Sequence, residues 1–163
     1  MKTTTNIALW SLALVALGCG GEAVDCTFTE AASVVLGGGT VQTGFLALND
    51  NDVMTVVLGP QGLYMVTPSV RVRGMYPGVA GRRDGNDPLI EIKAYLNDVE
   101  IGSSAREHLG LTQTANGDEG LGIFMPFTVV QADYLNQSVL LRGTVSDACG
   151  RSANDELTIV VVQ

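Results

Sequence analysis

Charged residues are scarce in this sequence, and most of those present are acidic. Only 16% of the 163 residues are charged, and 9 Lys and Arg face 17 Asp and Glu, which gives a net charge of −8 at pH 7. Loss of residues 1–18 would remove only Lys2 among the charged residues and leave the chain more negative. The phosphates of nucleic acid require a basic face, so this composition argues against nucleic acid as a partner. It also argues against direct electrostatic binding to anionic lipid, and the negative surface favours solubility.

The sequence also has few of the groups that catalysis uses. It has a single histidine, His108, and no Gly-x-Ser-x-Gly segment of the kind that carries the nucleophile of many serine hydrolases. A histidine without a partner motif is typical of a surface or loop. The glycine run at residues 37–39 lacks the Lys and Ser or Thr of a phosphate-binding segment, so we expect a loop there. We predict no catalytic site, no metal site and no cofactor.

Apolar residues and glycine, in contrast, are plentiful. Apolar residues make up 46% of the chain, which excludes a disordered protein, and its length fits a leader and one domain. Helix-forming residues are scarce, whereas Val, Thr and Gly are common. This composition predicts an all-β domain.

The first residues, MKTTTNIALWSLALVALGC, have the form of an export signal. One positive charge precedes an apolar run from Ile7 to Leu17 that only Ser11 interrupts. As a helix this run covers roughly 16 Å, about half the thickness of a bilayer core. It is therefore too short to span a membrane and is typical of a signal peptide.

The end of the leader, Ala16-Leu17-Gly18-Cys19, resembles the lipobox of bacterial lipoproteins. The match lies at Gly18 and Cys19, whereas Ala16 and Leu17 depart from the usual residues. In that family the cysteine thiol receives a diacylglyceryl group and the leader is cut before the cysteine. The resemblance implies a signal peptide at residues 1–18.

The same resemblance implies that Cys19 is lipidated and that residues 19–25 form a tether. The protein would then be attached to a membrane through its lipid anchor. Gly20 is not the Asp that retains such proteins at the inner membrane of enteric bacteria, which favours the outer membrane. The alternative is ordinary cleavage, because Ala16-x-Gly18 and Gly21-x-Ala23 both satisfy the small-residue rule, and the product would then be a secreted protein.

The cysteine count favours lipidation. Ordinary cleavage after Gly18 would leave an exposed thiol at Cys19 in an oxidising compartment. Lipidation removes this thiol and leaves Cys26 and Cys149 as a pair. A bridge between them would close a loop of more than 100 residues and stabilise the domain by about 4–5 kcal/mol on the chain-entropy estimate.

Residues 26–163 show repeated alternation of apolar and polar residues between turn signals. In LIEIKAYL, the residues Ile90, Ile92 and Ala94 share one face, and Asn97-Asp98 suits a tight hairpin turn. Further alternating strands begin at Ser69 and Val139, and another ends the chain. The remaining candidate strands are Gly44 to Leu48, Val53 to Leu58, Leu63 to Thr67 and Gly122 to Val130. Such spacing predicts an immunoglobulin-like or fibronectin-like β-sandwich of seven to nine strands, with a small β-barrel as the alternative.

Three acidic segments invite comparison with calcium sites. They are residues 48–52, 82–88 and 116–120, which contain Asp50, Asp52, Asp84 and Asp87 among their carboxylates. None has the twelve-residue spacing of a helix–loop–helix calcium site. Asn, Asp and Gly are also the ordinary residues of turns, and we expect turns here.

The most distinctive internal segment is VVLGPQGLYMVTPSVRVRGMYP, residues 56–77. Pro60 suits the second position of a tight turn, and Gln61 is either a turn residue or a binding residue. The segment resembles a stretch in predicted envelope lipoproteins of myxobacteria. We expect a lipid-anchored envelope protein whose non-catalytic sandwich binds a protein or polysaccharide partner or has a structural role. The alternative is a secreted carbohydrate-binding or calcium-dependent module.

Overall fold

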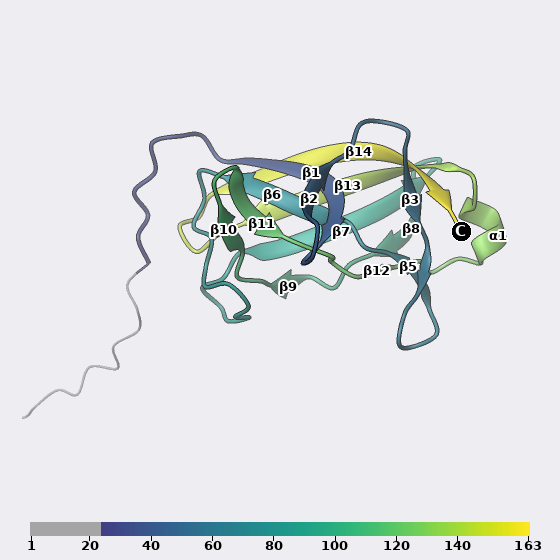
Figure 1. Ribbon diagram of the computed structural model, residues 1–163, viewed down its shortest axis with the longest axis horizontal. Helices are drawn as coiled ribbons and strands as arrows, with labels where there is room; N and C mark the ends of the chain where they lie inside the picture. The colour runs from purple at the N-terminus through teal and green to yellow at the C-terminus, as the bar shows by residue number, and fades with distance from the viewer. Residues whose placement is uncertain (1–23) are drawn as a thin grey trace, which may run out of the picture.

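The computed structural model describes residues 24–163, and these residues form an all-β domain, as predicted (Figure 1). They contain fourteen strands and one short helix, α1 (Gln131–Tyr134). The expected seven to nine strands are too few because several strands are pieces of only two to four residues. No helix within residues 24–163 has the length and hydrophobicity to span a bilayer. The predicted signal peptide and Cys19 lie outside the described residues.

Two larger sheets and one small sheet build the domain. In spatial order, the first sheet consists of β10 (Thr112–Thr114), β11 (Gly117–Gly120), β6 (Ser69–Arg73), β1 (Ser33–Thr40) and β2 (Gly44–Ala47). The second consists of β3 (Asp52–Thr55), β14 (Ser152–Val162), β13 (Ser138–Ser146), β7 (Leu89–Leu96) and β8 (Val99–Ser103), with β9 (Glu107–His108) also paired to β7. The small sheet consists of β12 (Met125–Pro126), β5 (Tyr64–Val66) and β4 (Val57–Leu58). Neighbouring strands are antiparallel except β3 and β14, which are parallel.

The two larger sheets enclose one apolar core, an arrangement consistent with a β-sandwich (Figure 1). Leu36 and Val72 of the first sheet and Leu141 and Ile159 of the second are buried in the same cluster. The sheets approach closely at Gly143, where an added Cβ would lie 2.6 Å from Cδ2 of Leu36. The Leu36 amide also donates a hydrogen bond to Oδ2 of Asp155 at 2.8 Å, which links the sheets through polar atoms.

The long strands of the second sheet follow the predicted alternation. Ile90, Ile92 and Ala94 are buried in β7, and their neighbours are more exposed. Asn97 and Asp98 have φ values of 50° and 65° and join β7 to β8, as expected for a two-residue hairpin turn. The alternation predicted for β13 and β14 is likewise confirmed.

Three local predictions were wrong. The glycine run at residues 37–39 lies inside β1 and is not a loop, because its backbone pairs with β2 without contributing side chains to either face. The strand expected from Gly122 to Val130 is reduced to Met125–Pro126. The candidate strand from Val53 to Leu58 is divided into β3 and β4, which pair in different sheets.

Candidate functional site

The predicted bridge between Cys26 and Cys149 is present, with an S–S distance of 1.99 Å and a Cα–Cα distance of 5.5 Å. It joins the segment before β1 to the turn between β13 and β14. Asp147 shapes this turn, because its carboxylate accepts hydrogen bonds from the amides of Cys149 and Arg151 and from the amide of Tyr76. The bridge is therefore anchored on a turn that is itself held by partly buried hydrogen bonds.

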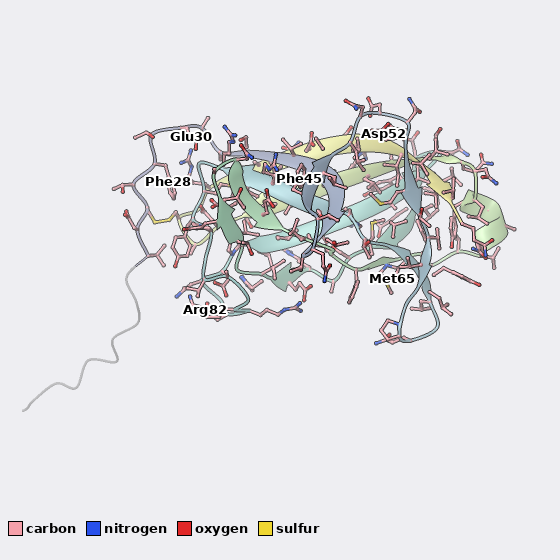
Figure 2. All side chains as sticks on the ribbon, viewed as in Figure 1. Phe28, Glu30, Phe45, Asp52, Met65 and Arg82 are labelled. Atoms are coloured by element: carbon pink, nitrogen blue, oxygen red, sulfur yellow. A yellow bond between two sulfur atoms is a disulfide. The ribbon has the colours of Figure 1, made fainter. Side chains whose placement is uncertain are left out.

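Arg151 holds the same N-terminal segment a second time. Its guanidinium lies 4.7 Å from the centre of the Phe28 ring and donates a hydrogen bond to the Glu30 carbonyl at 2.8 Å. Figure 2 shows the bridge at one end of the long axis of the domain, and in Figure 1 α1 and the β4–β5 hairpin lie toward the other end. The N-terminal segment thus leaves the domain at the end remote from the hairpin.

The carboxylates of the first acidic segment organise a turn. Oδ1 of Asp50 accepts the Thr158 amide at 3.0 Å, and Oδ2 of Asp52 accepts the Asn49 amide at 2.8 Å. Both contacts satisfy backbone donors next to β3 and β14. These hydrogen bonds give the two aspartates a structural role, which is to hold the shape of the loop.

The second acidic segment contains a buried carboxylate, Asp87. It accepts the amides of Val79 and Asp84 at 2.9 and 2.8 Å, and Arg82 lies beside it. Burial acts to raise the pKa of Asp87, but the two amides and Arg82 outweigh it, so the pKa is lowered. His108, whose Nδ1 lies 2.6 Å from the Asp87 carbonyl oxygen, packs beside this loop. The histidine is thus a strand residue of β9 that contacts a structural loop.

The third acidic segment is not a turn alone, because residues 117–120 form β11. Glu119 is buried, and its carboxylate accepts hydrogen bonds from Nη2 of Arg71 at 2.9 Å and from the Phe45 amide at 3.2 Å. Arg71 also lies 4.3 Å from the centre of the Phe45 ring. The sequence analysis missed this network because its members come from β2, β6 and β11, far apart in the chain.

The acidic segments do not converge on one site. Within residues 24–163 no group of three or more His, Cys, Asp or Glu side chains is placed to hold a metal ion. Each carboxylate described above has amide or arginine partners, and these partners account for its position.

Three aromatic rings are covered by arginine side chains. Besides Phe28 and Phe45, the ring of Tyr95 lies 4.8 Å from the guanidinium carbon of Arg142, which also pairs with Glu156. Sugar-binding platforms use exposed aromatic faces, which these three rings lack, whereas Phe124 beside the β4–β5 hairpin is 60% exposed.

The β4–β5 hairpin carries exposed apolar side chains. Pro60 and Gln61 occupy its turn, where the Gly62 amide donates to the Gly59 carbonyl at 2.9 Å, as the sequence predicts. Beside the turn lies a hollow of about 210 Å³ lined by Leu63, Phe124 and other apolar residues, with Gln61 at its rim. Gln61 is exposed, which places it within reach of a ligand.

A second hollow, here called the β2–β3 groove, separates the β1–β2 hairpin from β3 and β4. Its volume is about 360 Å³, and its lining includes Gly38, Leu46, Leu48, Val53, Thr55 and Val57. No residue of the lining is charged. Leu46, Val53 and Val57 are 51%, 57% and 43% exposed, which is unusual for three neighbouring large apolar side chains on an acidic protein.

Similarity to known proteins does not assign a function to these surfaces. No family model, curated protein or solved structure matches the chain.

Proposed function

We propose that this chain is a lipid-anchored protein of the bacterial cell envelope, held at the outer membrane through Cys19, whose domain binds a protein or polysaccharide partner or has a structural role and does no catalysis. In this proposal residues 1–18 are an export signal, residues 19–25 are a tether and residues 26–163 are the displayed domain. The lipid attaches the protein to the membrane surface without crossing it.

The bridge between Cys26 and Cys149 is the observation that carries the proposal. The chain has three cysteines, and this bridge uses two of them. Cys19 is left outside the bridge, at the position where lipoproteins carry their lipid. Lipidation accounts for an odd cysteine in an exported protein, whereas secretion with a free N-terminal thiol does not.

The arrangement of the domain supports a display role. The bridge and Arg151 hold the N-terminal segment at one end of the domain, so the β4–β5 hairpin lies remote from the point where a tether would be attached (Figure 2). Two exposed uncharged surfaces, the β2–β3 groove and the hairpin, are then accessible to partners. The carboxylates and His108 serve turns and strand pairing, which favours binding over catalysis.

The strand order supports an immunoglobulin-like form of the domain. Immunoglobulin domains place strands A, B, E and D in one sheet and C, F and G in the other. Equating β1, β6, β11 and β10 with A, B, E and D, and β7, β13 and β14 with C, F and G, reproduces both orders. The strands β2 to β5 are then insertions between A and B, β8 and β9 lie between C and D, and β12 lies between E and F.

Metabolic labelling tests the proposal directly. In a bacterium that makes the protein, radioactive palmitate should label the parent and the Cys26→Ser/Cys149→Ser variant but not Cys19→Ser. The Cys19→Ser protein should also leave the membrane fraction. Equal membrane association of Cys19→Ser and the parent, or absence of label from both, would show the lipid anchor to be wrong.

A further inference from the structure

The β2–β3 groove is bounded by a strand with a free edge. β3 is the terminal strand of the second sheet, and within residues 24–163 it pairs only with β14. No residue of β14 lines the groove, so the groove lies on the other side of β3. An edge strand directs about half of its backbone donors and acceptors away from its partner. The groove therefore offers hydrogen bonds to a further strand.

The opposite wall of the groove fits the side chains of such a strand. It is made by the β1–β2 hairpin, from which Leu46 and Leu48 contribute apolar surface. Gly38 pairs with Leu46 across the hairpin, and Leu48 packs over it, since an added Cβ on Gly38 would lie 3.6 Å from Leu48 Cδ1. Figure 1 shows this hairpin and β3 on the same side of the domain.

β3 is only four residues long, which itself limits pairing at its edge, but this edge carries neither lysine nor proline. Such edges usually carry lysine, proline or a bulge. β3 presents Val53 and Thr55 instead, and its one charged residue, Asp52, is held in the preceding turn by Asn49. The absence of charge in a protein with a net charge of −8 indicates an occupant that is itself uncharged where it enters the groove.

We propose that the β2–β3 groove binds an extended, uncharged polypeptide segment of another protein, which adds a strand to the free edge of β3. Backbone hydrogen bonds to β3 provide affinity, and alternate apolar side chains pack against Leu46 and Val57. β3 is four residues long, so the inserted segment is short. The inference rests on the binding role in the proposed function but not on Cys19. Peptide binding and palmitate labelling therefore succeed or fail separately.

A synthetic strand peptide tests the proposal. The probe is fluorescent Lys-Thr-Val-Thr-Val-Thr-Val-Thr-Lys, and the control peptide has the same side chains with alternate backbone nitrogens methylated. The purified protein should bind the probe, and methylation should abolish binding because it removes the backbone donors. Val53→Lys, which places a charge in the groove, should weaken binding by about tenfold or more.

Val99→Lys is the matched control variant. Val99 is 64% exposed on β8, the terminal strand at the opposite edge of the same sheet, so this change charges an edge remote from the groove. It should leave probe affinity unchanged, and both variants should keep the melting temperature of the parent. Failure of the probe to bind, equal binding of the methylated peptide, or equal loss with Val99→Lys would overturn the proposal. A dimer of the free protein that Val53→Lys dissociates would assign the groove to a second copy and also overturn it.

Discussion

At the scale of single residues, buried and partly buried carboxylates set the pH response of the domain. Asp87 is the clearest case because it is 1% exposed and accepts two backbone amides beside Arg82. Asn at this position would place a side-chain NH2 group against one of these backbone N–H donors. We therefore expect Asp87→Asn to lower the free energy of unfolding by about 1–3 kcal/mol at pH 7. Urea denaturation measures this loss, and Asp98→Asn in the exposed β7–β8 turn serves as the control.

The pH dependence of the same variant follows from the lowered pKa of Asp87. A lowered folded-state pKa stabilises the protein fully above the unfolded-state pKa, which is about 3.9 for Asp. This stabilisation is lost as the pH falls through the folded-state pKa. The difference between the parent and Asp87→Asn should therefore shrink below about pH 4. A difference that stays constant down to pH 2 would contradict this role.

Asp118 in β11 should behave in the opposite way. Burial, together with the neighbouring charge of Glu30, raises its pKa, so the ionised carboxylate opposes folding at neutral pH. Asp118→Asn should increase the free energy of unfolding at pH 7 by less than about 1 kcal/mol, because the group is only partly buried. The gain should vanish at pH 3, where the parent carboxyl is protonated. Thermal melts at the two pH values measure it, and a destabilised variant at pH 7 would disprove the assignment.

At the scale of elements, the packing of β1 against β13 depends on a missing side chain. Gly143 lies opposite Leu36, and an added Cβ would come within 2.6 Å of Leu36 Cδ2. Gly143→Ala should therefore lower the free energy of unfolding by about 1–3 kcal/mol through overpacking. Gly85→Ala is the control, since its Cβ would meet no atom within 4 Å. Equal stability of Gly143→Ala and Gly85→Ala would show that the sheets are not closely packed here.

The same elements show how far the sequence predicts the fold. β7, β13 and β14 are predictable because their apolar side chains alternate over eight or more residues. The part of β1 at residues 37–39 could not be predicted, because glycine has no side chain and so gives no alternation of apolar and polar residues. β11 could not be predicted because Gly117–Gly120 resembles a turn. The burial of Glu119 is explained by Arg71 and Phe45, which lie 48 and 74 residues away in the chain.

The candidate sites divide in the same way. Cys26 and Cys149 could be paired from the sequence, because the lipobox resemblance sets Cys19 aside and only these two cysteines remain. The β2–β3 groove could not be predicted, because it exists only where the β1–β2 hairpin lies beside β3. The arginines over Phe28, Phe45 and Tyr95 likewise depend on contacts between distant strands.

At the scale of the whole molecule, the disulfide closes nearly the entire domain. It joins residues 123 positions apart, and the Cys26→Ser/Cys149→Ser variant should lose up to about 4–5 kcal/mol in the free energy of unfolding. The parent treated with reductant should unfold at the same urea concentration as this variant. Limited proteolysis should also cut the segment before β1 faster in the variant, because only Arg151 then holds it. Unchanged stability and proteolysis would show that the bridge contributes nothing.

The central claim is that Cys19 carries lipid while the other two cysteines pair with each other. Intact mass of the mature protein, purified from a bacterium that makes it, tests both parts at once. The account predicts a chain that begins at Cys19, carries a diacylglyceryl group, usually with a further acyl chain, and lacks the two hydrogens of Cys26 and Cys149. A chain that begins after Gly18 or Ala23 without lipid would contradict the account.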